Sequence, residues 1–354
     1  MMRRAAFFLC WLAIGGAALA EFVPDADRRG VDLPPDRHGP VPVLVDFFLL
    51  DVTSVNGASE TFGASLYFDL KWKDSRMAFD AAAFGAERVL YTGANAEEQL
   101  GKMWSPEIDV ANITGDSQVN DKALTIFKDG TVEYEVRLAG EFTSAMELSR
   151  FPFDSQRLNV QLESFSWNAN EVVLVPAHKD APDAGTRSKH MNANLVVRDW
   201  EVQSITAGVQ TEKYVTGDGY SRFVSTIQVK RNPWFYVWSV LFPLVLVTFF
   251  AFMCFFWDQE TLTERVAQVL TCLLTVTAQS LAVNGDLPKI SYFTRIDYAF
   301  LLTYIVLLVV AVESIFAKFL NERNHALADR IDYRSAWIVS VAYMLGMAAV
   351  FWIP

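Results

Sequence analysis

The chain has 354 residues, of which 52% are hydrophobic and 14% aromatic, and its formal net charge is −11. The acidic excess lies in one block, because residues 21–232 hold 32 acidic and 21 basic side chains and the remaining residues hold nine of each. An acidic chain without a basic face is unsuited to bind nucleic acid. The separation of charged from apolar sequence also argues against a uniform soluble enzyme.

The first twenty residues have the composition of a signal peptide. A positively charged start is followed by an apolar run and by a cleavage site of the A-x-A type that ends at Ala20. The alternative, an uncleaved anchor helix, is disfavoured because the run is short for a bilayer. We therefore predict a signal peptide over residues 1–20 and export of residues 21–231. All three cysteines lie outside that block, so it must fold on a hydrophobic core without disulfides.

Residues 21–231 show the alternation that is typical of half-buried strands. Between Leu66 and Trp72, apolar residues alternate with polar ones. The dipeptide Asp129-Gly130 joins two more alternating segments and suits a tight hairpin turn. Many short strands without helical periodicity predict an all-β, immunoglobulin-like sandwich.

The composition changes abruptly after Arg231, where long apolar segments begin. Four of them are long enough to cross a bilayer. The predicted spans are residues 232–257, 263–286, 296–320 and 335–354. An exported N-terminal block followed by four crossings places the C-terminus on the same side of the membrane. The predicted second domain, residues 232–354, is thus an all-α four-helix transmembrane domain.

The second span is too polar for a helix that faces lipid. Helical spacing defines two neighbouring stripes on it. The more polar stripe consists of Glu264, Gln268, Thr271, Thr275 and Gln279, and the other of Glu264, Ala267, Thr271, Leu274, Ala278 and Leu281. The second stripe offers a carboxylate that attracts cations and leucine rings that close a narrow pore by dewetting. The residues alone permit both registers, and also a helix buried in a bundle.

The exported block contains Phe151-Pro152-Phe153-Asp154, and Arg231-Asn232-Pro233 opens the first span. With the four spans in this order, the chain resembles the pentameric ligand-gated ion channels, the Cys-loop receptor superfamily. Trp72-Lys73-Asp74 and Leu287-Pro288 also match family motifs. The match is to the prokaryotic branch, which lacks the disulfide that gives the superfamily its name: Ser144 and Leu158 stand at the two cysteine positions.

The resemblance implies a homopentameric channel, not an enzyme, in the bacterial inner membrane, with its N-terminal domain and C-terminus in the periplasm. It implies membrane lipids and a small-molecule agonist or protons as partners, and neither a cofactor nor a metal. It selects the stripe of Glu264, Ala267, Thr271, Leu274, Ala278 and Leu281 as the pore lining, permeated by monovalent cations. Gln268, Thr275 and Gln279 would then face the neighbouring subunit.

The resemblance also implies residues for ligand binding and for coupling. Agonists of the family bind between subunits among aromatic side chains, and the matching positions are Tyr67, Phe165, Tyr214 and Tyr220. Such a cage suits a cationic amine, although each ring singly is as compatible with packing. The coupling positions are Asp154, Arg231, Glu60, Pro288 and Lys289.

No sequence motif of a hydrolase, nucleotide-binding or metal site is present. The four histidines are not paired at metal-binding spacing. The main alternative to a channel is a membrane-anchored periplasmic solute-binding or assembly protein that conducts no current.

Overall fold

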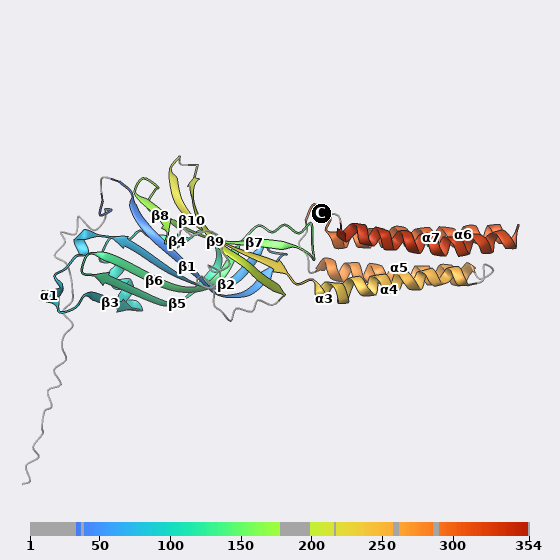
Figure 1. Ribbon diagram of the computed structural model, residues 1–354, viewed down its shortest axis with the longest axis horizontal. Coiled ribbons are helices and arrows are strands. Elements are labelled where there is room, and N and C mark those ends of the chain that lie inside the picture. The colour runs from blue at the N-terminus through green and yellow to red at the C-terminus, as the bar shows by residue number, and fades with distance from the viewer. Residues whose placement is uncertain are drawn as a thin grey trace, which may run out of the picture.

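The computed structural model describes residues 33–36, 39–177, 199–215, 217–257, 262–285 and 290–352. It shows a β-sandwich at one end of an elongated chain and four apolar helices at the other (Figure 1). The predicted combination of an all-β domain with a four-helix domain is confirmed. The predicted signal peptide lies outside the described residues.

The sandwich consists of two sheets. The first has the strand order β3–β5–β6–β2–β1–β8, with bounds Arg88–Thr92, Ile113–Phe127, Thr131–Thr143, Thr61–Lys73, Val41–Asn56 and Val172–Pro176. The second has the order β4–β7–β10–β9, with bounds Ile108–Val110, Ser155–Ser164, Gly219–Arg231 and Trp200–Lys213. Neighbouring strands are antiparallel except β1 and β8, which are parallel.

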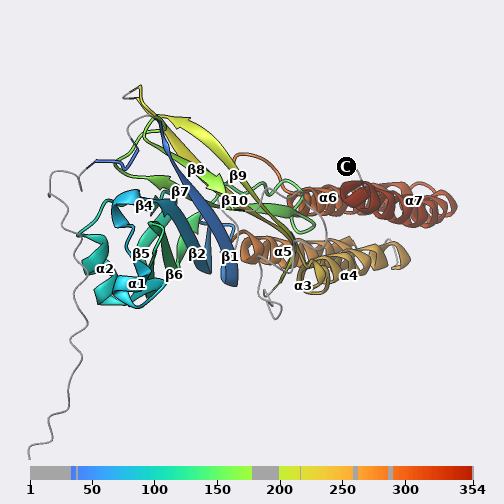
Figure 2. The same cartoon turned by 60° about the vertical axis from the view of Figure 1, so that its left-hand side comes forward.

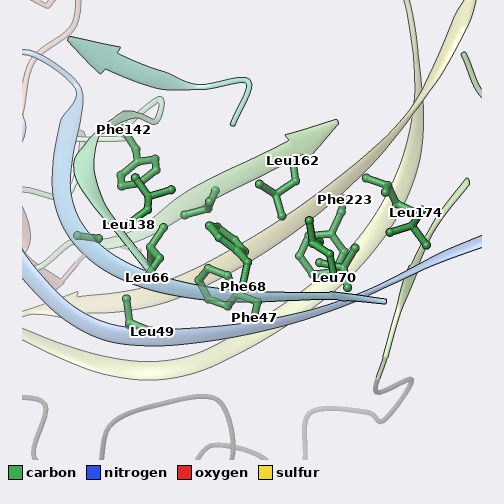
Figure 3. Close-up of a cluster of buried hydrophobic side chains, with 14 of the residues drawn as sticks. Phe47, Leu49, Leu66, Phe68, Leu70, Leu138, Phe142, Leu162, Leu174 and Phe223 are labelled. Atoms are coloured by element: carbon green, nitrogen blue, oxygen red, sulfur yellow. The ribbon is translucent and has the colours of Figure 1, made fainter. Parts of the chain in front are cut away.

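The core between the two sheets is made by the alternating residues of the strands (Figure 3). Leu66, Phe68, Leu70 and Trp72 are all buried on β2, as their spacing predicted. The β5–β6 hairpin turns at Gly130, whose φ is +81° and whose missing Cβ would lie 2.4 Å from the Asp74 carbonyl oxygen. Only glycine fits such a position. Two short helices that alternation did not predict, α1 (Ala81–Phe84) and α2 (Ala94–Leu100), complete the domain.

Each of the four helical segments is long and apolar enough to cross a membrane. The first is continuous but irregular: α3 (Trp234–Tyr236), a π-helical segment (Val237–Leu241), α4 (Phe242–Phe252) and a 3₁₀ segment (Met253–Phe256). The others are α5 (Leu262–Gly285), α6 (Arg295–Asn321) and α7 (His325–Trp352). In two views α6 and α7 lie side by side, next to α4 and α5 (Figure 1 and Figure 2).

Helix α7 begins at His325, ten residues before the predicted start of the fourth span. The buried face of this helix explains the extension, because Ala328 and Asp332 continue the line of the buried residues Ala336, Tyr343 and Met347. The predicted boundary at residue 335 marks where the apolar sequence begins, whereas the helix itself begins earlier, in polar sequence.

The sandwich contacts the helices through the loop between β6 and β7. Leu148 and Phe151 of this loop belong to the hydrophobic cluster of the helical domain. The Leu148 N–H donates to the Tyr292 hydroxyl at 3.1 Å, and the Phe153 ring lies 5.6 Å from that of Phe351. The end of α7 therefore returns to the sandwich, as expected for an even number of crossings.

Candidate functional site

The predicted ligand-binding aromatics gather around a pocket at the end of the second sheet. A pocket of about 350 Å³ is lined by Glu163, Ser164, Phe165, Tyr214 and Tyr220. Glu163 and Ser164 end β7, Tyr214 follows β9 and Tyr220 lies near the start of β10. The fold thus brings together three of the four predicted residues, which are far apart in the sequence.

The backbone holds the Phe165 ring out toward solvent. The Phe165 N–H donates to the Glu107 carbonyl at 2.9 Å, and the buried Ser164 hydroxyl donates to the Pro106 carbonyl at 2.6 Å. The phenylalanine side chain is nevertheless 78% exposed. The exposed Phe165 ring is therefore available for contact with a group outside the described part of the chain.

A charged pair borders this pocket. Arg222 Nε donates to Glu163 Oε2 at 2.9 Å, and the Tyr214 hydroxyl donates to Glu163 Oε1 at 2.5 Å. The hydrogen bond to the carboxylate raises the pKa of Tyr214 and holds it neutral. Sequence reasoning missed Glu163 and Arg222. Each lies two residues from a predicted aromatic and so on the same face of its strand, which was the available signal.

Tyr67 does not line the pocket, because it lies on β2 in the other sheet. Its ring is 5.7 Å from Phe48, and its hydroxyl donates to the carboxylate of Glu135. Burial, together with this hydrogen bond, raises its pKa. Within one chain the structure therefore separates Tyr67 from the other three predicted ligand-binding residues.

A row of carboxylates crosses the sheet beside Tyr67. Asp46 of β1 is paired with Asp69 of β2, and Asp69 with Glu135 of β6. Like charges opposite each other on neighbouring strands repel. Lys71 relieves this, since its ammonium lies 2.8 Å from Asp69 and 2.7 Å from Glu133. Burial still raises the pKa of Asp69, because it disfavours the ionised form more than Lys71 favours it.

Two of the predicted coupling residues, Asp154 and Arg231, form an ion pair where the sandwich meets the helices. Arg231 Nε donates to Asp154 Oδ1 at 2.7 Å, and its second nitrogen to Oδ2 at 3.2 Å. Only 1% of the Asp154 side chain and 9% of the Arg231 side chain are exposed. Gln156 Nε2 also donates to Asp154 Oδ2, at 2.6 Å. The two bonds from Arg231 to Asp154 have the bidentate geometry that a guanidinium favours.

Aromatic rings enclose the guanidinium of Arg231. Its central carbon lies 4.1 Å from the ring centre of Trp200, 4.9 Å from that of Phe151 and 5.9 Å from that of Tyr236. Cation–π attraction adds to the ion pair in such a box. The rings come from β9, from the β6–β7 loop and from the first helix, so this one side chain joins three segments. Sequence reasoning did not foresee these aromatic partners.

The remaining predicted coupling residues are not part of this cluster. Glu60 lies in the β1–β2 turn with φ +52°, and its carboxylate accepts from the Met146 N–H at 3.5 Å. Within the described ranges, the ion pairs of Arg231 include Asp154 and not Glu60. The expectation that Glu60 joins the pair is therefore not met. Pro288 and Lys289 lie outside the described residues.

Ser144 and Leu158, which stand at the two cysteine positions of the superfamily, lie next to each other without a disulfide. The Ser144 hydroxyl donates to the Arg157 carbonyl at 2.8 Å and accepts from the Asn159 N–H at 3.2 Å. These hydrogen bonds reach the backbone on either side of Leu158, which is fully buried. Hydrogen bonds and packing thus join the ends of the β6–β7 loop.

Helix α5 has one face packed in the bundle and one face open. The packed face consists of Arg265, Val269, Cys272, Val276 and Val283. All six residues of the predicted pore stripe are exposed: Glu264, Ala267, Thr271, Leu274, Ala278 and Leu281. Leucines at positions 274 and 281 are 71% and 69% exposed in the single chain. The open face is therefore a mixed face of one carboxylate, small residues and leucines.

Two glutamines of the more polar stripe are bonded within the same chain. Gln268 Nε2 donates to the Phe250 carbonyl at 2.6 Å, and Gln279 Nε2 to the Val240 carbonyl at 2.7 Å. Both acceptors belong to the first transmembrane segment. Their amide nitrogens thus have partners within the chain, and the position of these glutamines against a neighbouring subunit stays a prediction. Thr275, the third residue of that expectation, is exposed and donates to the Thr271 carbonyl of its own helix at 2.9 Å.

Arg265, which the sequence did not single out, is fully buried at the start of α5. Its guanidinium lies 2.8 Å from Asp332 of α7 and also donates to the Trp257 carbonyl. Asp332 precedes the predicted fourth span, which is why the pair was missed. The available signal for Asp332 was its helical spacing from Ala336, because the buried face of α7 extends N-terminally beyond the apolar segment.

Among the described residues, no group of three or more His, Cys, Asp or Glu side chains is placed to hold a metal ion.

Comparison with known proteins identifies both domains. Residues 30–233 match the family model of the neurotransmitter-gated ion-channel ligand binding domain, and residues 240–348 that of the neurotransmitter-gated ion-channel transmembrane region. The chain belongs to the neurotransmitter-gated ion-channel family.

Members of this family from bacteria and animals are similar over most of the chain. A proton-gated ion channel of Gloeobacter violaceus is 26% identical over 314 residues, 88% of this chain and 83% of that protein. The human gamma-aminobutyric acid receptor subunit rho-2 is 24% identical over 292 residues, 81% of this chain and 60% of the receptor. A gamma-aminobutyric acid receptor subunit beta-like of Drosophila melanogaster is 26% identical over 291 residues, 77% of this chain and 55% of that subunit.

The matched region thus covers less than two thirds of these two receptor subunits and most of the bacterial channel. Family membership confirms the resemblance inferred from the motifs and identifies the chain as a ligand-gated ion channel, not an enzyme. It is a membrane protein with an extracellular ligand-binding domain.

Proposed function

We propose that the protein is a homopentameric, cation-selective channel of the bacterial inner membrane, opened from the periplasmic domain. The observation that carries this proposal is the open face of α5. A helix that faced lipid there would be uniformly apolar, whereas this face begins at a carboxylate, Glu264, and continues through small residues and leucines. Five copies facing one axis give each of these positions a ring.

The order of the rings along α5 supports the pore assignment. A ring of Glu264 at one end concentrates cations and repels anions. Rings of Leu274 and Leu281 close a narrow passage, because water leaves an apolar constriction. Between the rings of Glu264 and Leu274, Thr271 supplies hydroxyls that hydrate a passing ion. Leu274 is therefore the proposed gate and Glu264 the proposed selectivity filter.

The proposed agonist site lies between subunits. Within the described part of the chain, the pocket of Phe165, Tyr214 and Tyr220 is open to solvent, and the Phe165 ring is its most exposed member. Tyr67, on the opposite sheet, would belong to the adjacent subunit and supply that cover. Aromatic faces beside the Glu163 carboxylate favour a ligand with a cationic amine. Protons are the second candidate stimulus, because the partly buried carboxylate Asp69, whose pKa is raised, lies on the sheet that carries Tyr67.

Recording from the full-length protein in liposomes tests the proposal. We expect cation currents under one of two stimuli, which reflect the named activities of its relatives: acidification from about pH 8 to about pH 4, or γ-aminobutyric acid. Glu264→Gln should reduce the cation-to-anion permeability ratio, while Glu322→Gln, which alters an exposed residue after α6, should not. An unchanged ratio in Glu264→Gln contradicts the filter assignment, and a wild-type protein without current favours the solute-binding alternative.

The gate has its own test in the same recordings. Leu274→Ala widens and wets the proposed constriction, so we expect openings without stimulus. We also expect half-maximal opening at about tenfold lower concentration of protons or γ-aminobutyric acid. Leu270→Ala, at an exposed position of α5 outside the pore stripe, is the matched control. Equal behaviour of the two variants contradicts the gate assignment.

A further inference from the structure

The side chains that join α5 to the first transmembrane segment have a common chemistry. Gln279 donates its amide N–H to the Val240 carbonyl, and Gln268 donates to the Phe250 carbonyl. The two glutamines are three helical turns apart and therefore on the same face of α5. Near its start, Arg265 donates to the Trp257 carbonyl as well. Polar links thus join the two segments along most of their length.

The first segment is irregular at both places where its carbonyls accept from these glutamines. Val240 lies in the π-helical segment, three residues before Pro243. Proline has no N–H, so the carbonyl four or five residues earlier, Ser239 or Trp238, lacks a backbone donor and the helix is irregular next to Val240. Phe250 lies in the last turn of α4, where the helix tightens and the carbonyl accepts from both Met253 and Gln268. Irregular backbone of the first segment therefore lies at the two levels where α5 carries glutamine.

Three threonines of α5 bond within their own helix instead. The hydroxyls of Thr271, Thr275 and Thr277 each donate to the carbonyl four residues earlier in their own helix. Such bonds satisfy the hydroxyl locally and leave the position of the helix free. The glutamines have longer side chains, and their bonds depend on where α5 lies relative to the first transmembrane segment.

The first transmembrane segment continues directly from β10. This strand carries Tyr220 and Arg222 at the aromatic pocket and Arg231 at the junction. After Arg231 only Asn232 and Pro233 precede α3, and the Asn232 N–H donates to the Asp199 carbonyl at 2.7 Å. A displacement of β10 therefore acts on the first segment without a flexible linker between them.

We propose that Gln279 and Gln268 are positioning residues that make α5 move together with the first transmembrane segment. A change at the pocket would pass along β10 and the first segment and reach α5 through these two amides. The proposal rests on the channel function proposed above and assigns it a route that lies entirely within one subunit. Neither glutamine needs to touch the agonist or the permeating ion.

Single-channel recording of the full-length protein in liposomes tests this route, with protons or γ-aminobutyric acid as the stimulus. Gln279→Met and Gln268→Met keep the length of the side chain and remove the donor. We expect each to shift the stimulus midpoint about threefold to tenfold to higher stimulus, the range of interhelical hydrogen bonds in membranes, with unchanged unitary conductance. Thr277→Val removes a hydroxyl bonded within α5 and should not shift the midpoint. Equal midpoints in all variants overturn the proposal.

A distance measurement decides the same question without a stimulus. Spin labels at Trp238 and Leu270, both exposed, would report the separation of the first segment and α5 after the buried Cys254 and Cys272 are replaced by alanine. Dilution with unlabelled protein isolates distances within one chain. We expect the distribution to broaden in the Gln268→Met/Gln279→Met double variant and not in Thr277→Val. Equal widths overturn the proposal. Broadening in a protein that never conducts overturns the channel function alone.

Discussion

Arg265 of α5 and Asp332 of α7 form an ion pair that is closed to solvent. A guanidinium nitrogen lies 2.8 Å from Asp332 Oδ2, and the two side chains are 0% and 4% exposed. Charges in such a place lose their hydration, so each is tolerable only while the other is present. The pair joins the start of α5 to the first part of α7, which precedes the predicted fourth span.

Removing one partner of this pair should destabilise the protein strongly. Asp332→Ala leaves a buried guanidinium without its carboxylate, which costs about 3–5 kcal/mol in comparable pairs. Glu313 of α6 lies near both Asp332 and Arg265, so its carboxyl group can partly replace the lost partner and we expect the lower end of that range. Thermal unfolding of the detergent-solubilised protein measures the loss. Glu322→Ala, at an exposed site, should change the free energy of unfolding by no more than about 0.5 kcal/mol. Equal midpoints for the two variants would contradict a buried pair.

Arg231→Lys tests whether the geometry of the junction matters beyond its charge. Lysine keeps the positive charge but lacks the planar fork that meets Asp154 and the face that stacks on Trp200. We expect a loss of about 1.5–3 kcal/mol of interaction, seen as a reduced open probability at saturating stimulus with unchanged conductance. Lys230→Ala alters the exposed neighbour on β10 and serves as the control. A fully active Arg231→Lys channel would show that charge alone suffices.

Glu163→Gln tests the charged border of the aromatic pocket. The carboxylate accepts hydrogen bonds from Tyr214 and Arg222, and it is the negative group beside the exposed rings. We expect binding of an amine ligand to weaken about tenfold, and the pKa of Tyr214 to fall toward its ordinary value. A binding isotherm and ¹³C NMR of labelled tyrosine measure the two effects. Glu212→Gln, 3.6 Å from Arg222 and more exposed, should change binding less. Tighter binding in Glu163→Gln would contradict an amine ligand.

Asp69 and Asp129 should give opposite pH dependences of stability. The pKa of Asp69 is raised by burial, so its favourable contribution is complete below its ordinary pKa and is lost as the pH rises through the folded-state value. Asp69→Asn should therefore gain stability over wild type as the pH rises from about 4 to about 7. The pKa of Asp129 is lowered to about 2, chiefly by its hydrogen bond from Lys73.

Asp129→Asn is thus the matched control with the opposite sign. Its wild-type contribution is present above the ordinary aspartate pKa and disappears as the pH falls toward about 2. Thermal unfolding midpoints at a series of pH values, compared between each variant and wild type, show both trends. Parallel curves for Asp69→Asn and wild type would mean that Asp69 titrates as an exposed carboxylate.

Much of the fold follows from local sequence. The alternation from Leu66 to Trp72 and the turn at Gly130 determine strands and a hairpin, because pleating and backbone sterics act between close neighbours. The four apolar segments determine the helices in the same way. Motifs anticipated that Asp154 and Arg231 would meet, and that Phe165, Tyr214 and Tyr220 would gather at one site.

What the sequence left undecided depends on how elements are rotated and aligned against one another. The pairing of Glu163 with Arg222 follows from the register of β7 and β10, and that of Arg265 with Asp332 from the contact of α5 with α7. The amides of Gln268 and Gln279 had two candidate environments by periodicity alone. Only the packed helices, which place the Phe250 and Val240 carbonyls opposite them, give these amides partners in the same chain. Hydrophobic periodicity sets which face is buried, but polar partners are chosen by geometry between distant segments, and that exists only in the folded molecule.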